Sequence, residues 1–379
     1  MNESLSVLIP DGESEFALFA AHCLARYPSV NIHVLSSRRW AAIRFSRHCR
    51  TFTHRSASRD NAARLETVAE LVRKHSIDVL LPTETEWIGF AVKNRATLSK
   101  LMAVAPVPDA RGFDVANNKW HLAQFMAEHD IPGPPTTLVT LDDAFERQMQ
   151  AMKFPVLLKP CTAWGGDGIE RFEDLAGLKA YLANRDPERT RERFVVQTVL
   201  TGFVVGVNVL AQNGRILATT MQRGIIPNTK KFAAAGAIRF IKDERFLNAA
   251  DKLIRALGWS GFANLDTFYD SADDQLKILE INARFWGSLR GSLVAGISFP
   301  YLACLAALDV PFARPDYQLA RYVHTKTAMR EALLRLVGKN REKEFAVKES
   351  GLKFLLSDPL AEIVRAFQQE SSSRQPVTI

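Results

Sequence analysis

Residues 278–288 read ILEINARFWGS, and this run places a carboxylate, an amide and a guanidinium at the end of an apolar strand. Side chains two positions apart in a strand share a face, so Glu280 and Asn282 point the same way while Leu279 and Ile281 pack behind them. An ionised carboxylate in such a strand is costly unless a partner compensates its charge. A magnesium ion, which prefers oxygen ligands, would compensate it.

The preceding strand supplies a second acid. Residues 262–270 and 275–281 are predicted to be two strands joined by a turn at 271–274, and this pairing lets Asp266 face Glu280. Arg284 follows the strand end, where its forked donors can hold a transferring phosphoryl group. The alternative is a solvent-facing hairpin with a structural Glu–Arg pair.

Residues 158–169 read LKPCTAWGGDGI, a strand ending in Lys159 and a loop containing Gly165, Gly166 and Gly168. Glycines let backbone amides approach a phosphate chain closely, and the lysine adds a point charge. The loop is not a Walker A motif, because the lysine precedes the glycines. An ordinary hairpin is the alternative.

Composition bounds the class of protein. The 379 residues are 47% hydrophobic and 24% charged, which excludes collagen-like and wholly disordered chains and predicts two to three domains. The net charge of +8 favours anionic partners without choosing among them. The four cysteines form no CxxC pair, and no apolar run reaches the length of a membrane span. Residues 1–16 lack the features of a secretory signal. We therefore expect a cytoplasmic protein.

The first part of the chain alternates strands and helices, which predicts a parallel sheet covered by helices. We expect strands at 5–9, 31–35, 77–81 and 102–105, with helices at 16–25, 61–75 and 86–98. The turn at 10–14 has one glycine and no GxGxxG pattern, which disfavours an NAD(P)-dependent oxidoreductase.

The remainder mixes both periodicities. We expect helices at 116–129, 142–152 and 174–184, strands at 136–139 and 156–159, and a strand-rich region at 194–281. The predicted fold is α/β and α+β, with a Rossmann-like domain at 1–115, a two-lobed domain at 116–312 (lobes 116–193 and 194–312) and a basic, mostly helical extension at 313–379.

Two basic segments have open interpretations. Seven arginines and no acid lie between Arg38 and Arg59, forming either an anion-binding surface or a solvated face, and no nucleic-acid motif accompanies them. Residues 321–343 combine basic side chains with Leu333, Leu334 and Leu336, as expected of a segment that contacts an anionic membrane or a protein, or of an ordinary capping helix.

Together these motifs resemble the ATP-grasp superfamily, in its carbamoyl-phosphate-synthase-like and biotin-carboxylase-like branch of carboxylate–amine ligases. The resemblance rests on Asn118-Lys119, the IPGP run at 131–134, Leu158-Lys159-Pro160 with its glycine loop, the VVQ run at 195–197, Asp266, and the EINAR run at 280–284. It implies two lobes that clamp ATP behind the N-terminal domain.

The resemblance also implies roles for individual residues. Lys119 and Lys159 would hold phosphates beneath a flap formed by Gly165, Gly166 and Gly168. The backbone of Gln197, Thr198, Val199 and Leu200 would read the adenine edge, with Leu279 on the ring. Asp266, Glu280 and Asn282 would bind two magnesium ions, for which manganese could substitute. Arg284 would stabilise the transferred phosphoryl group, and Arg223 and Lys231 would reach the γ-phosphate or substrate.

The implied reaction forms an acyl phosphate and ADP from a carboxylate and ATP, followed by attack of an amine or similar nucleophile. Separately from the resemblance, a homodimer is among the expected partners. Thr198 stands where the family often has an acid, and residues 203–205 are apolar where a ribose-binding acid is often found. These departures keep open a non-catalytic, regulatory ATP-binding module.

Overall fold

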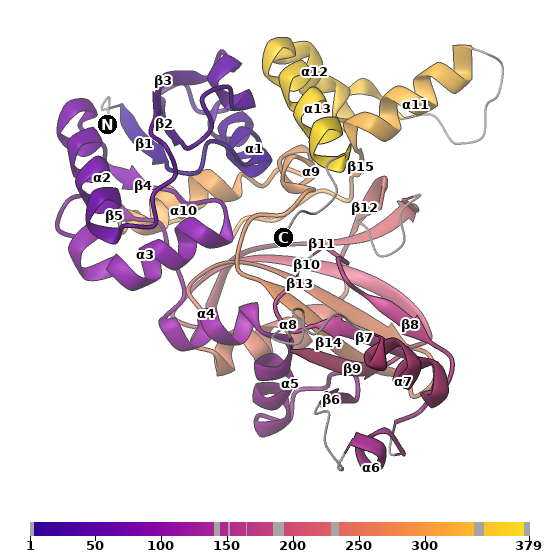
Figure 1. Cartoon of the computed structure of the whole chain (residues 1–379). Coiled ribbons are helices and arrows are strands. Elements are labelled where there is room, and N and C mark those ends of the chain that lie inside the picture. The colour runs from indigo at the N-terminus through magenta and orange to yellow at the C-terminus, as the bar shows by residue number, and fades with distance from the viewer. Residues whose placement is uncertain are drawn as a thin grey trace.

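A computed structural model describes residues 4–139, 145–150, 152–163, 165–184, 193–228, 235–336 and 345–374. Three sheets organise these residues (Figure 1). The predicted combination of α/β and α+β architecture is confirmed.

The N-terminal sheet is parallel, in the order β3-β2-β1-β4-β5. Its strands are β1 (Leu5–Ile9), β2 (Val30–Ser36), β3 (Cys49–His54), β4 (Val79–Leu80) and β5 (Ala103–Val104), connected through α1 (Glu15–Leu24), the short helix η1 (Ala42–Phe45), α2 (Asn61–His75) and α3 (Thr85–Leu98). The strand β3 was not predicted, because its sequence CRTFTH is mostly polar and it lies at the sheet edge.

Alternation along β1 explains how this sheet is covered. Val7 and Ile9 pack in one cluster with α1 and with α10 (Phe299–Ala307), a helix from much later in the chain. Leu8, on the opposite face, packs with α2 and α3. The N-terminal sheet is therefore completed by a helix outside the first 115 residues.

The connection to the second part is helical. Residues 111–115, where a domain boundary was predicted, lie within α4 (Ala110–Asn117), and α5 (Lys119–Glu128) follows it. The single helix predicted at 116–129 is therefore wrong. Asn118 separates the two helices because its side-chain oxygen accepts hydrogen bonds from the amides of Trp120 and His121, which caps α5.

Two antiparallel sheets follow. The smaller has the order β6-β9-β7-β8, and the larger has the order β14-β13-β10-β11-β12-β15. The smaller comprises β6 (Thr136–Leu138), β7 (Val156–Pro160), β8 (Glu170–Phe172) and β9 (Phe194–Thr198), with α6 (Phe145–Gln150) and α7 (Leu175–Ala183). The larger comprises β10 (Gly202–Gln212), β11 (Arg215–Ile226), β12 (Ala237–Ile241), β13 (Gly261–Asp270), β14 (Gln275–Asn282) and β15 (Arg321–Val323), with α8 (Glu244–Ala256) against one face.

The C-terminal residues are not a detached extension. Strand β15 pairs with β12, so the larger sheet continues past residue 312. After it come α11 (Thr325–Leu336), η3 (Val347–Glu349), α12 (Leu352–Ser357) and α13 (Pro359–Arg374), and the last two lie near α1 (Figure 1). No helix in the described part of the chain is long and apolar enough to cross a membrane. Residues 337–343 of the predicted basic segment lie outside the described residues.

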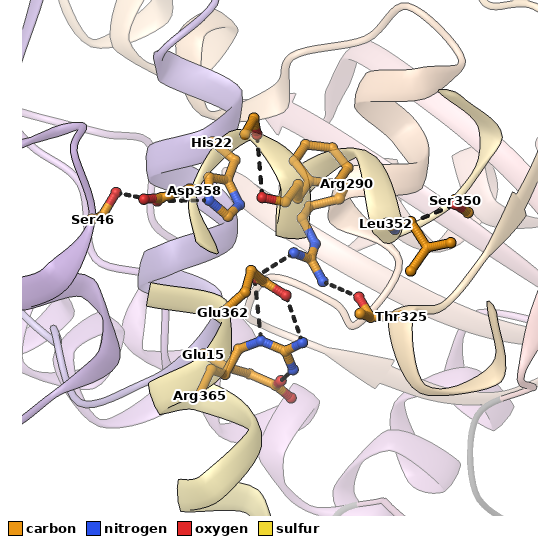
Figure 2. A network of polar contacts seen from close by, with 12 residues as sticks. Glu15, His22, Ser46, Arg290, Thr325, Ser350, Leu352, Asp358, Glu362 and Arg365 are labelled. Carbon is orange, nitrogen blue, oxygen red and sulfur yellow. Dashed lines mark hydrogen bonds and ion pairs between the residues drawn. The ribbon is translucent and has the colours of Figure 1, made fainter. Parts of the chain in front are cut away.

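A buried ionic network attaches these helices to the rest of the molecule (Figure 2). Arg290, from α9 (Leu289–Val294), donates to Glu362 of α13 at 2.6 Å. Arg365 donates to the same carboxylate at 2.8 Å and to Glu15 of α1 at 3.4 Å. Because these groups come from distant parts of the chain, the network joins α1, α9 and α13.

Candidate active site

The pairing of β13 with β14 places Asp266 directly opposite Glu280, as predicted. Burial, and then the charge of Glu280, raise the pKa of Asp266 to about 7, while Arg284 and Lys159 oppose the shift. Two such carboxylates are unfavourable neighbours unless a cation lies between them. Directly across from Asp266 on β10 is Gly206, and the side chain of Gln222 lies 3.3 Å from where a Cβ of Gly206 would stand.

Asn282 adds a third oxygen to this pair. Its Oδ1 atom is buried and has no hydrogen-bond partner among the described residues, and Asn282 follows Glu280 by two positions on β14. No cluster of three or more His, Cys, Asp or Glu side chains suited to a metal occurs in the described ranges. Two carboxylates and an amide oxygen nevertheless fit Mg²⁺, which commonly takes one or two carboxylates and completes its shell with phosphates and water.

Leu279 corrects one detail of the prediction. The register shifts between the Asp266–Glu280 and Thr267–Ile278 pairs, so Leu279 is an unpaired bulge residue. Ile278 and Ile281 both join the buried cluster under α8, whereas Leu279 is half-buried and outside the described core clusters. It therefore does not pack behind the site with Ile281.

Lys159 ends strand β7 and lies in the same electrostatic environment as the acids. Its Nζ atom donates to Oε1 of Gln197 at 2.6 Å, and the side chain is buried. Burial lowers the pKa of Lys159 to about 8, Glu280 opposes that shift, and Lys119 adds to it. The structure thus groups Lys159, Lys119, Asp266 and Glu280.

The glycine loop is anchored by Lys119, the first residue of α5. The Lys119 Nζ atom donates to the carbonyl oxygen of Ala163 at 2.5 Å, and the Lys119 amide donates to the carbonyl oxygen of Cys161 at 2.9 Å. Gly165, Gly166 and Gly168 have φ values of 66°, 82° and 70°, a conformation that other residues adopt at a cost. The glycines are therefore required by the path of the loop beside Lys119.

These shifts predict a bell-shaped pH dependence of Mg·ADP binding. As the pH falls through about 7, Asp266 gains a proton and its affinity for Mg²⁺ drops. As the pH rises above about 8, Lys159 becomes neutral and must take up a proton to hold a phosphate. Because binding then takes up one proton, the affinity for Mg·ADP falls by up to about tenfold for each further pH unit. Calorimetry should show the high-pH decline in the wild type but not in Lys159→Arg; the same decline in both would contradict this assignment.

The segment predicted to read adenine has two of its amides already engaged. The Thr198 amide donates to the carbonyl of Pro135 and the Val199 amide to that of Pro155, at 3.2 and 3.0 Å. Gln197 is also committed, since it accepts from Lys159 and donates to Thr136. Contacts of this segment with adenine are therefore expected from the Leu200 amide and from the carbonyl oxygens of residues 197–200.

Arg284 lies between the acids and the N-terminal domain. Its guanidinium is 5.2 Å from the ring centroid of Phe16 in α1 and donates to the Phe285 carbonyl at 2.9 Å. The Phe285 amide donates in turn to Thr83, just after β4. The N-terminal domain therefore helps to position Arg284.

Comparison with known proteins bears on the same residues. A family model described as "ATP-grasp in the biosynthetic pathway with Ter operon" matches residues 190–329. A carbamoyl-phosphate synthase from Methanobrevibacter smithii is 26% identical over 183 residues, covering 46% of this chain and 48% of that protein. Residues 190–329 thus match an ATP-grasp family model, and the chain is similar to a carbamoyl-phosphate synthase. It spans about half the length of that synthase.

Solved structures share the fold over most of the chain. Biotin carboxylase from Campylobacter jejuni superposes with a TM-score of 0.65 and 15% identity, over 84% of this chain and 75% of that one. The ADP complex of N5-carboxyaminoimidazole synthetase from Staphylococcus aureus gives a TM-score of 0.67 and 13% identity, over 85% and 82%. These findings confirm the resemblance to the carbamoyl-phosphate-synthase-like and biotin-carboxylase-like branch.

One predicted site residue, Arg223, lies away from the site, and the position of another, Lys231, is outside the described part of the chain. The Arg223 guanidinium lies 3.8 Å from the ring centroid of Phe203, which packs with the α8 cluster. That face of the sheet carries Leu265 and is opposite to the one carrying Asp266, so the structure does not bring Arg223 to the acid pair.

The ATP-grasp sheet carries polar side chains that sequence analysis missed. Asn264, which pairs with Asn282 across β13 and β14, donates to Asn208 at 2.8 Å, and Asn208 donates to Thr220 at 3.1 Å. Asn208 and Thr220 are fully buried. The detectable signal was a lone asparagine in the apolar run GFVVGVNVLAQ of β10. This polar row lies one step from the acid pair on the same face.

Proposed function

We propose that this chain is an ATP-dependent ligase that activates a substrate carboxylate as an acyl phosphate and joins it to an amine. The observation that carries the proposal is the Asp266–Glu280 pair, which is coupled electrostatically to Lys159 on one side and Arg284 on the other. Such a grouping neutralises a triphosphate and the charge that develops on its transferred group.

In the first step a carboxylate oxygen attacks the γ-phosphorus of ATP, and the bond from that phosphorus to the ADP oxygen breaks. Lys119 and Lys159 hold the phosphates, and Arg284 stabilises the transferred group. Asp266, Glu280 and Asn282 would hold Mg²⁺, which when bound offsets the negative charge of the phosphates. The glycine loop excludes water, which would otherwise hydrolyse the acyl phosphate.

In the second step the amine nitrogen attacks the carbonyl carbon, and the bond from this carbon to the phosphate oxygen breaks. The nitrogen loses a proton to solvent, and phosphate leaves with one oxygen of the original carboxylate. Amide formation and ADP release are therefore linked through the acyl phosphate.

That oxygen provides the test. With an acid whose carboxylate carries heavy oxygen, each amide formed should release one phosphate molecule containing one labelled oxygen, measured by mass spectrometry. Unlabelled phosphate despite amide formation would exclude the acyl phosphate. Tight ATP binding without stimulation of ADP release by any acid–amine pair would favour the regulatory module instead.

A homodimer, a cytoplasmic location, a second metal ion and contact of residues 313–379 with an anionic membrane or a protein stay predictions of the same proposal. The contacts of Phe354 in α12 with His22 and of Arg365 in α13 with Glu15, both on α1, support a structural role for part of that segment. Vesicle co-sedimentation at low salt would test the membrane contact directly.

A further inference from the structure

A large cavity opens between the N-terminal domain and the candidate active site. Its volume is about 1300 Å³, and both Thr162, at the start of the glycine loop, and Arg284 line it. The opposite wall is formed by the carboxyl edge of the parallel sheet, where Ser14, Asn61 and Thr85 mark the beginnings of α1, α2 and α3. Helix N-termini at such an edge favour anions.

The acids of this cavity already accept hydrogen bonds from the protein. Asp11 accepts from the amides of Thr83 and Glu84, both at 2.7 Å. The other three acids also accept hydrogen bonds. Glu13 accepts from Ser36 and Ser37, and Glu84 accepts from Ser14 and Thr85. Glu86 accepts from Arg64. Each of these carboxylates therefore has a partner within the N-terminal domain, and the one buried carboxylate oxygen without a partner among the described residues is Oδ1 of Asp11.

Several cations of the same cavity do not have such partners. The exposed side chains of Arg38, Arg59 and Lys93 line it and form no ion pair or hydrogen bond within the described residues. Arg64 donates to Glu86 through Nη1, but its buried Nη2 atom has no partner there. Some of the cations that line the cavity therefore have no ion-pair partner among its acids.

Aromatic rings adjoin these cations. The Arg64 guanidinium stacks over Trp87 at 4.1 Å and Phe90 at 4.5 Å from their ring centroids, and both rings line the cavity. This stacking fixes the guanidinium plane, and it places flat apolar surface beside the unpartnered donor. The cavity therefore suits a ligand that combines a planar or apolar body with negative charge.

We infer that the acid substrate of the proposed ligase carries a second anionic group, a carboxylate or a phosphate, on a planar or apolar body. The reacting carboxylate lies at Arg284, and the second anion lies among Arg38, Arg59, Arg64 and Lys93. This inference rests on the proposed function. A pocket for a drug-sized ligand measures about 300–1000 Å³, so a single small acid would leave most of this cavity to water.

The test uses three rigid aromatic acids as probes: benzoate, terephthalate and 4-phosphonobenzoate. Calorimetry on the full chain, without nucleotide, should show at least about tenfold tighter binding of the two dianions than of benzoate. Comparing terephthalate with 4-phosphonobenzoate distinguishes a second carboxylate from a phosphate-like group. Equal affinity for all three, or no binding, would overturn the inference.

A pair of double variants locates the anion site. Arg59→Gln/Lys93→Gln removes two exposed, unpartnered cations from the cavity and should abolish the preference for dianions. Arg73→Gln/Lys100→Gln removes the same charge from exposed positions that do not line the cavity and should leave the preference intact. If both double variants lost the preference for dianions equally, the preference would depend on the net charge of the protein and not on a site in the cavity.

A third variant separates this inference from the proposed function. Glu280→Gln should retain the dianion preference while losing ADP release. If wild type binds dianions selectively but never releases ADP with any acid and amine, the ligase proposal fails and the anion site stands. If ligation occurs with acids that carry a single charge and dianions give no advantage, the anion site fails and the ligase stands.

Discussion

Glu280→Gln should reduce ADP release by at least about a thousandfold and leave the protein folded. The substitution removes one of two carboxylates that face each other across β13 and β14, and with it the charge that would hold Mg²⁺ on the phosphates. A coupled assay for ADP, with Mg²⁺ and an acid–amine pair that supports turnover in the wild type, measures the effect.

The fold of this variant can be checked independently. Because the charge of Glu280 contributes to the raised pKa of Asp266, its removal relieves repulsion, and the metal-free variant should melt at or above the wild-type temperature. Glu128→Gln, at an exposed position of α5, is the matched control and should keep full activity. Near-normal turnover in Glu280→Gln would refute the site assignment.

Among these variants, Glu362→Gln should lower the free energy of unfolding the most, by roughly 3–5 kcal/mol, as expected when one partner of a buried ion pair is removed. Burial alone would raise the pKa of Glu362, but Arg290 and Arg365 outweigh burial and hold this pKa below its ordinary value. Without the carboxylate, the Arg290 guanidinium, whose side chain is only 2% exposed, loses its anionic partner. Urea unfolding measures the loss, and limited proteolysis should show release of α13.

An exposed pair provides the comparison. Arg55 and Glu70 also form an ion pair, but their side chains are 50% and 47% exposed, so Glu70→Gln should cost no more than about 1 kcal/mol. Replacing Arg290→Met together with Glu362→Leu should recover part of the stability, because no unpaired charge is left at position 290 and Arg365 keeps Glu15 as a partner. A Glu362→Gln variant as stable as Glu70→Gln would show that the network does not hold α13 in place.

Local patterns were sufficient for much of the fold. The alternation of apolar runs predicted β1 at residues 5–9 and α2 at residues 61–75 with the bounds that the structure has. The EINAR run and the turn at 271–274 were sufficient to predict that the two strands pair. The register that the turn sets would place Asp266 opposite Leu279, and the bulge at Leu279 brings Glu280 to that position.

Other features depended on contacts between distant parts of the chain. The face on which Arg223 lies, the bulge at Leu279 and the addition of β15 to the larger sheet are set by pairing along whole strands, which no local pattern specifies. The same holds for the seven arginines at 38–59: Arg38 and Arg59 line the cavity beside Arg284, whereas Arg55 pairs with Glu70.

Short-range patterns were therefore sufficient to predict which strands and helices carry the candidate site residues, since strand and helix periodicity act over a few residues. Which charges are satisfied depends instead on long-range packing. Whether an arginine meets a carboxylate, as Arg290 meets Glu362, or remains open to a ligand, as Arg59 does, depends on groups brought together from opposite ends of the chain.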